Sequence, residues 1–225
     1  MHASYTYNLG ILDKFIGDAI MAVFGVPFAT PEDPINACNA ALKMKDAVKI
    51  LNEQRSSIGL RGISIGIGIN TGMVLSGNIG SQKRMEYSCI GDHVNLASRV
   101  EGLTKGYGVE ILITEHTFVE TQDFFHVREI DSVIVTGKTK PVRLYELLGK
   151  KSAPLSDQSL KAAQLYKEGL SLYKKRNFEA AISKFQKGSA LYKDGPCATM
   201  MERSAKYLIK PPEDDWEGVY VATGK

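Results

Sequence analysis

Seven residues, Ile63 to Ile69, constrain the fold of this chain more than any other segment. Isoleucines occupy every second position, and small residues fill the positions between them, namely Ser64, Gly66 and Gly68. Alternation with a period of two is typical of a β-strand, so one face of this strand is bulky and the other is nearly bare. We therefore expect another element to approach the bare face closely.

A β-hairpin is predicted upstream, in the sequence LDKFIGDAIMAVFGVP at residues 12–27. Alternating residues lead to the turn dipeptide Gly17-Asp18, and an almost wholly apolar strand follows from Ala19 to Phe24. Asp18 therefore lies near a strand end. These residues leave two interpretations open: an ordinary turn in which the aspartate bonds its own backbone, or a carboxylate presented to a ligand.

The remaining patterns predict an α+β domain that ends near Gly149. An amphipathic helix is expected from Thr30 to about Glu53, with Leu51 on its apolar face. The other expected elements are strands at 73–75, 85–90, 110–114, 125–135 and 141–148, helices at 93–103 and 115–120, and a loop at 77–84.

The sequence divides into a domain at 1–149, a linker at 150–158 and a helical segment at 159–225. Small and aromatic residues of the helical segment have the relative spacing of one tetratricopeptide unit of about 34 residues; they are Gly169, Ala181, Phe185 and Gly188. A single unit cannot bury its own face. We expect it to dock on the first domain or on a protein partner, with residues 207–225, including Trp216, covering it.

Charge and cysteine usage argue against several function classes. The net charge is only +3 and the basic residues are scattered, which gives no case for a nucleic-acid groove or a membrane patch. No apolar run approaches the roughly 18 to 20 residues of a membrane span. Cys38, Cys89 and Cys197 are too far apart for a disulfide framework or a zinc site, so we expect a reducing, cytoplasmic setting.

Asn95 and Arg99 form the sharpest local pair, because residues four apart on a helix point the same way and can meet one ligand. An arginine fork beside an amide suits a phosphate, although a solvated polar stripe is the alternative. Asp18 with a second carboxylate would make a divalent-metal site, but spacing alone supplies no obvious partner. Taken by themselves, these residues support the hypothesis of a site that binds phosphate and a metal ion.

Four ordered blocks of sequence resemble the catalytic domain of class III adenylyl cyclases of the bacterial kind. They read DKFIGDAIMAVFG, GIGINTGMVLSGNIGS, EYSCIGDHVNLASRVEGLTK and VTGKTKPVRLYEL, and the match covers about Gly10 to Leu148. The resemblance implies a ferredoxin-like domain that forms a head-to-tail homodimer with sites at its interface. It also implies conversion of ATP to 3′,5′-cyclic AMP and pyrophosphate, with two Mg²⁺ or Mn²⁺ ions, in cyclic-nucleotide signalling.

The resemblance assigns catalytic roles to three residues. Asp18 matches one of two metal-binding carboxylates, and Asn95 matches the amide that positions the ribose. Arg99 matches the arginine that meets the charge developing on the α-phosphate, which is electrostatic stabilisation of an in-line displacement.

The resemblance also assigns substrate contacts. Lys14 occupies the position that reads adenine N1, and Ser88 the position that reads the adenine amino group. A donor at Lys14 favours ATP, since cyclases specific for guanine carry an acid there. Lys83 and Arg143 fall where basic side chains approach the triphosphate.

One departure from the family is at the N-terminus. Family members carry their first metal aspartate on an initial strand, in a motif resembling F-x-D-I-x-G-F, and two helices follow it. Met1 to Asn8 is too short to hold these, so we expect a shortened domain of a longer parent, with or without membrane attachment, and little activity of this chain alone. The alternatives are a non-catalytic cyclase-homology module for dimerisation or regulation with a partner-binding helical tail, and a guanylyl cyclase, which Lys14 disfavours.

Overall fold

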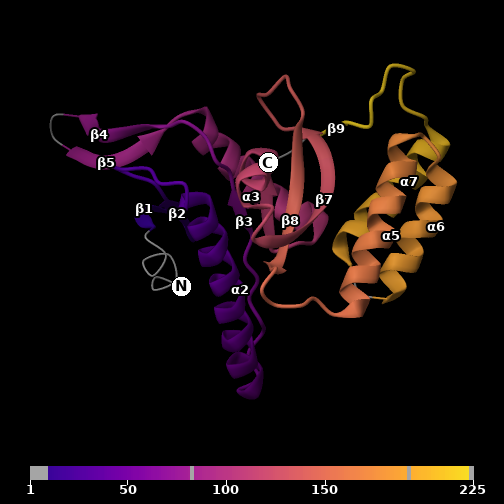
Figure 1. Cartoon of the computed structure of the whole chain (residues 1–225), viewed down its shortest axis with the longest axis horizontal. Coiled ribbons are helices and arrows are strands. Elements are labelled where there is room, and N and C mark those ends of the chain that lie inside the picture. The colour runs from indigo at the N-terminus through magenta and orange to yellow at the C-terminus, as the bar shows by residue number, and fades with distance from the viewer. Residues whose placement is uncertain (1–9, 82–83, 192–193, 223–225) are drawn as a thin grey trace.

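The computed structural model describes residues 10–81, 84–191 and 194–222. A central sheet separates two thin β-ribbons and a long helix on one side from three packed helices on the other (Figure 1). The elements in chain order are β1 (Ile11–Ile16), β2 (Ala19–Val23), α2 (Asp33–Ser57), β3 (Ile67–Ile69), β4 (Leu75–Ser81), β5 (Arg84–Ile90), α3 (Asp92–Tyr107), β6 (Ile111–Thr114), α4 (Glu115–Thr121), β7 (Phe125–Ile134), β8 (Val142–Lys150), α5 (Asp157–Lys174), α6 (Phe178–Leu191), α7 (Gly195–Ile209) and β9 (Tyr220–Val221).

The central sheet has the strand order β3-β6-β8-β7-β9. Strands β6, β8 and β7 are antiparallel neighbours, whereas β3 pairs parallel with β6 and β9 pairs parallel with β7. One buried cluster joins the sheet to α2, and a second joins it to α3 and the C-terminal helices. The predicted α+β class is confirmed.

The bare face of the predicted strand is covered by α3. A Cβ on Gly68 would lie 2.3 Å from the backbone nitrogen of Glu101 and 2.4 Å from the carbonyl oxygen of Ala97. A Cβ on Gly66 would lie 2.2 Å from Oγ1 of Thr104. Helix and strand therefore meet at backbone distance, which only residues without a side chain permit.

The regular strand is shorter than predicted, because Ile67–Ile69 alone forms the ladder with β6. Upstream of it, the backbone N–H and C=O of Ile63 both bond the side-chain amide of Asn52 on α2, each at 2.8 Å. A side chain thus satisfies the backbone groups that a neighbouring strand would otherwise bond.

Two further expectations on this side of the molecule need correction. Residues 75–81 form β4 and pair with β5 along their whole length, so the predicted loop at 77–84 and strand at 73–75 are wrong. Helix α2 ends at Ser57 and its last turns extend beyond the sheet (Figure 1), which leaves Leu51 38% exposed rather than on a buried face. The β1–β2 hairpin is confirmed as antiparallel.

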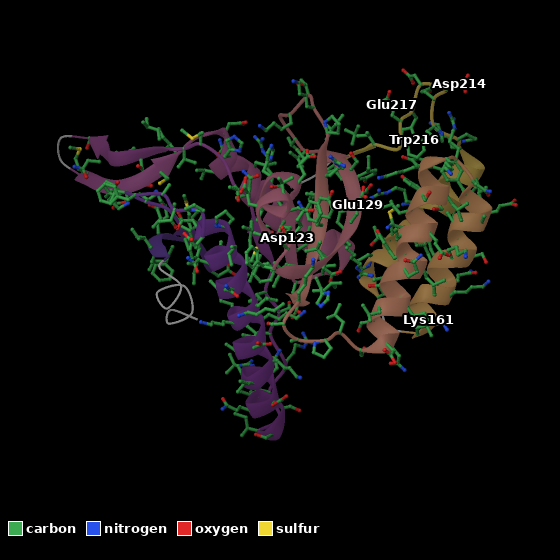
Figure 2. The ribbon with its side chains drawn as sticks, viewed as in Figure 1. Asp123, Glu129, Lys161, Asp214, Trp216 and Glu217 are labelled. Atoms are coloured by element: carbon green, nitrogen blue, oxygen red, sulfur yellow. The ribbon has the colours of Figure 1, made fainter. Side chains whose placement is uncertain are left out.

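The C-terminal helices pack on the first domain and share its buried cluster. The hydroxyl of Tyr166 on α5 donates to the carbonyl of Ile130 on β7 at 2.8 Å, and Lys174 pairs with Glu129, which Figure 2 shows on the helix-facing side of the sheet. Trp216 lies at one end of these helices (Figure 2) and packs on the rings of Tyr173, Phe178 and Tyr207. The sequence pattern did not predict α7, and assignment to a tetratricopeptide unit stays a prediction.

A buried charge network ties α7 to the end of α3. Asp131 on β7 accepts from the hydroxyl of Tyr107, the last residue of α3, at 2.5 Å, and from the guanidinium of Arg203 on α7. Asp131 has no exposed surface, and the side chain of Arg203 is 10% exposed and lies over the ring of Tyr220. Burial, with the Asp131 charge, raises the pKa of Tyr107 well above its usual range. The network fixes the C-terminal end of α3.

All three cysteines are buried, and none of them forms a disulfide. Burial raises the pKa of the Cys38 thiol to about 12. Among the residues that the structure describes, no helix is both long and apolar enough to cross a membrane.

We expect Gly68→Ala to lower the free energy of unfolding by about 1–3 kcal/mol, because the new methyl group meets the α3 backbone. Gly102→Ala is the matched control on α3, where nothing lies within 4 Å and alanine should stabilise the helix by up to about 1 kcal/mol. Urea unfolding measures both. Equal changes in the free energy of unfolding of the two variants would contradict the close packing of Gly68 on α3.

We expect Asp131→Leu or Arg203→Met alone to cost about 3–5 kcal/mol of stability, since each leaves an unpaired buried charge or donor. The double variant should lose much less than the sum of the two, which a double-mutant cycle by urea unfolding would detect. The exposed pair Glu202 and Lys206 on the same helix is the control, and neutralising both should leave the midpoint unchanged. Additive losses at Asp131 and Arg203 would refute the coupling.

Candidate active site

Helix α3 presents Asn95 and Arg99 on one face, as the spacing predicted. Asn95 is exposed, whereas Arg99 is half-buried under the turn between β7 and β8. Gly137 in this turn has φ +75°, and a Cβ there would lie 3.1 Å from Nη2 of Arg99. Nη1 of Arg99 is buried and has no hydrogen-bond partner among the described residues. A guanidinium with an unused donor fits an anionic ligand such as phosphate.

The same turn brings a second cation to the head of α3. Lys138 follows Gly137 and donates to the carboxylate of Asp92, the first residue of α3. This hydrogen bond is the main reason that the pKa of Asp92 lies below its usual range. Sequence reasoning did not single out Lys138, although it belongs to the fourth block of resemblance.

The N-terminal end of α3 is also anchored to the sheet. The side-chain amide of Asn70, just after β3, donates to the carbonyl of His93 at 3.0 Å and accepts from the hydroxyl of Thr114 at 2.7 Å. Gly72 passes so close to the His93 ring that a Cβ would lie 2.2 Å from Nδ1. Asn70 is a positioning residue that the analysis of the sequence missed, inside the block GIGINTG.

The structure brings Lys14 and Ser88 together through a residue that was not predicted. Oδ2 of Asp13 lies 3.3 Å from Nζ of Lys14 and accepts from Oγ of Ser88 at 3.0 Å. Lys14 lies on β1 and Ser88 on β5, so the two ribbons meet at this carboxylate.

Asp18 lies exposed at the turn of the β1–β2 hairpin, directly after Gly17 with φ +64°. Its carboxylate supplies the hard oxygen ligand that Mg²⁺ and Mn²⁺ prefer, so it fits a divalent cation. Within the part of the chain that the structure describes, no cluster of three or more His, Cys, Asp or Glu side chains could hold a metal ion.

Arg143 is not gathered at this site. Arg143 is 56% exposed on β8 and pairs with Glu115 of α4 at 3.0 Å, and this hydrogen bond is the main reason that the pKa of Arg143 is raised. Lys83 lies outside the described residues.

Two hollows among the described residues lie elsewhere. One of ≈ 570 Å³ runs along α2 near Glu110, and one of ≈ 360 Å³ lies beside Phe125. Neither is lined by Lys14, Asn95 or Arg99. The predicted residues lie on two parts of the chain: Asn95 and Arg99 on α3, beside the turn at 135–138, and Lys14 and Asp18 on the β1–β2 hairpin.

Comparison with known proteins connects this geometry to a family. Residues 13–149, more than half of the chain, match the family described as "Adenylate and Guanylate cyclase catalytic domain". The chain belongs to this family. The match contains Asp18, Asn95 and Arg99, and it confirms the resemblance and the cyclase fold predicted from the sequence.

Two curated relatives are adenylate cyclases. The chain is 40% identical over 187 residues to "Adenylate cyclase, terminal-differentiation specific" of Dictyostelium discoideum, which covers 81% of this chain and 9% of the relative. It is 44% identical over 147 residues to "Adenylate cyclase" of Anabaena cylindrica, which covers 61% of this chain and 28% of the relative. The chain thus spans a small part of these relatives' lengths.

A solved structure with a similar fold is that of the guanylyl cyclase Cya2, with a TM-score of 0.62 and 35% identity. The alignment covers 69% of this chain and 78% of that chain. The similar proteins include both adenylate and guanylyl cyclases, so family membership alone does not show whether the substrate carries adenine or guanine. That choice depends on the residues near Lys14.

Proposed function

We propose that this chain contributes the catalytic domain of an adenylate cyclase, which converts ATP to 3′,5′-cyclic AMP and pyrophosphate in cyclic-nucleotide signalling. The observation that carries the proposal is the Arg99 guanidinium on α3, whose Nη1 has no hydrogen-bond partner among the described residues, with the Lys138–Asp92 pair nearby at the start of the same helix. A guanidinium with an unused donor suits a phosphate group. The two adenylate cyclase relatives support the choice of reaction, and the three buried free thiols support a cytoplasmic location.

In this proposal α3 supplies the groups that act on the reacting atoms. Arg99, which lies beside the turn at Gly137, stabilises the negative charge that develops on the α-phosphate. Asn95 orients the ribose so that its 3′-hydroxyl lies in line with the leaving pyrophosphate. Lys14 donates to adenine N1, a contact that guanine, which carries a proton at N1, cannot accept.

Asp18 is the residue proposed to hold divalent cations. When bound, such ions lower the barrier to deprotonation of the 3′-hydroxyl and neutralise the triphosphate. Asp18 is the single carboxylate assigned to them, so we expect slow turnover by this chain alone. A non-catalytic module for dimerisation would bind nucleotide without forming cyclic AMP.

We further propose that two copies of the chain complete the site. Asp18 is exposed at the hairpin turn, and the ribbons beside it, with the segment that leads into β4, expose large apolar side chains: Phe15 at 64%, Met85 at 60%, Leu75 at 67% and Met73 at 89%. Exposed apolar surface of this extent is typical of an interaction face. A second copy would cover it and would place Asp18 of one protomer opposite Arg99 of its partner.

The test is complementation between Asp18→Asn and Arg99→Ala. Cyclic AMP formed from ATP and Mn²⁺ is measured by mass spectrometry. We expect slow formation by the unmodified chain and a loss of turnover by about 10²–10³-fold in Arg99→Ala, with a much smaller change in ATP affinity. Each variant alone should be inactive, and mixing them should restore activity, because one site of the mixed dimer keeps both residues.

Lys105→Ala on the exposed side of α3 is the control and should retain activity. Nucleotide binding with no cyclic AMP from the unmodified chain would favour the non-catalytic module. Full activity in both variants would show that neither Asp18 nor Arg99 is needed for catalysis. A mixture that stays inactive would show that the two copies do not form a joint active site.

A further inference from the structure

Strand β1 contains a bulge at Asp13. Leu12 pairs with Ala22 and Lys14 with Met21, so Asp13 has no partner on β2. Consecutive residues of a regular strand point to opposite faces, and a bulge changes this direction. The bulge accounts for the contact between the neighbouring side chains of Asp13 and Lys14, whose charged atoms lie 3.3 Å apart.

The same carboxylate oxygen also holds Ser88. Oγ of Ser88 donates to Oδ2 of Asp13 at 3.0 Å, across from β5 to β1. The Asp13 side chain and Ser88 are each only 4% exposed, so little water competes for this hydrogen bond. One buried oxygen therefore engages both of the residues that the proposed function assigns to base recognition.

This arrangement fixes which hydrogen bonds the two residues have left to make. An ionised carboxylate only accepts, so the single proton of the Ser88 hydroxyl is used and its oxygen can act only as an acceptor. Lys14 carries three donors and no acceptor, and its ammonium is held beside Asp13 by the ion pair at 3.3 Å. What remains is an ammonium from Lys14 that can still donate, beside an acceptor from Ser88.

A donor beside an acceptor complements adenine and opposes guanine. Adenine presents an acceptor at N1 and an amino donor at C6, whereas guanine presents a proton at N1 and an acceptor oxygen at C6. A serine hydroxyl that is free to rotate would donate to that oxygen as readily as it accepts from the amino group. Asp13 removes this freedom.

We propose that Asp13 is a specificity-determining positioning residue, which selects adenine by holding the Ser88 hydroxyl as an acceptor and Lys14 as the neighbouring donor. This inference rests on the proposed function, because it takes Lys14 and Ser88 as the residues that face the base. Asp13 itself contacts neither the nucleotide nor the reacting atoms. It acts through the two side chains that it holds.

The test compares Asp13→Asn with the unmodified chain in the binding of two probes, the α,β-methylene analogues of ATP and GTP, each with Mg²⁺, by calorimetry. The amide of asparagine can donate to Ser88, which frees the hydroxyl proton. We expect the preference for the adenine analogue to fall by about tenfold, mainly through tighter binding of the guanine analogue. Asp46→Asn on the exposed face of α2 is the control and should keep the preference.

A second pair of variants separates this role from a general effect on folding. Asp13→Glu keeps an ionised carboxylate and should retain most of the preference. Ser88→Ala removes the acceptor itself, so adding Asp13→Asn to it should change the ratio of the two affinities little further. Circular dichroism on each variant shows whether it is folded, and the Ser88→Ala result stands even where Asp13→Asn unfolds.

The possible outcomes test the role of Asp13 separately from the proposed function. An unmodified chain that prefers the adenine analogue, with an unchanged ratio in Asp13→Asn, overturns the role of Asp13 and leaves the proposed function standing. If Ser88→Ala leaves the ratio of the two affinities unchanged, the role of Asp13 is likewise overturned and the proposed function stands. An unmodified chain that binds neither analogue overturns the proposed function, and the role of Asp13 with it.

Discussion

The close packing of α3 on the glycine face beside β3 is the constraint on which the rest of the structure depends. The backbone of α3 at Ala97 and Glu101 occupies the space where a side chain of residue 68 would lie. This contact flanks Arg99 and lies between Asn95 and Tyr107 along the helix, so it sets the depth of the whole of α3. A larger residue at position 68 would displace the proposed phosphate-binding face together with the buried core.

The two ends of α3 are fixed by different parts of the chain. Asn70 and Lys138 hold its first turn, close to the residues proposed to act on ATP. At the other end, Asp131 and Arg203 hold Tyr107, and the first turn of α7 packs on the glycine that terminates α3. The C-terminal helices therefore help to support α3, and the sheet, α3 and these helices share one core.

The sequence predicted those features that depend on local pattern. The alternation at 63–69 predicted both the strand and the close approach to it, and the residues that flank Gly17-Asp18 predicted the hairpin. The sequence pattern could not predict features that depend on residues far apart in the chain. Strand β4 exists because β5 pairs with it, despite its glycines, and Asn52 shortens β3 from eleven residues away. Asp13 could not be identified, since its bulge depends on the register with β2. The roles of Lys14 and Ser88 came from resemblance, whereas their shared partner came from the structure.

The central claim is that a metal-bound nucleotide lies against the polar face of α3 and the β1–β2 hairpin. Paramagnetic broadening by Mn²⁺ tests it most directly, with amide resonances of the labelled chain recorded with the α,β-methylene ATP analogue and first Mg²⁺, then Mn²⁺. The account predicts that Mn²⁺ selectively weakens the resonances of residues 14–18 and 95–99. Broadening confined to α5–α7, or equal broadening throughout the chain, would contradict it.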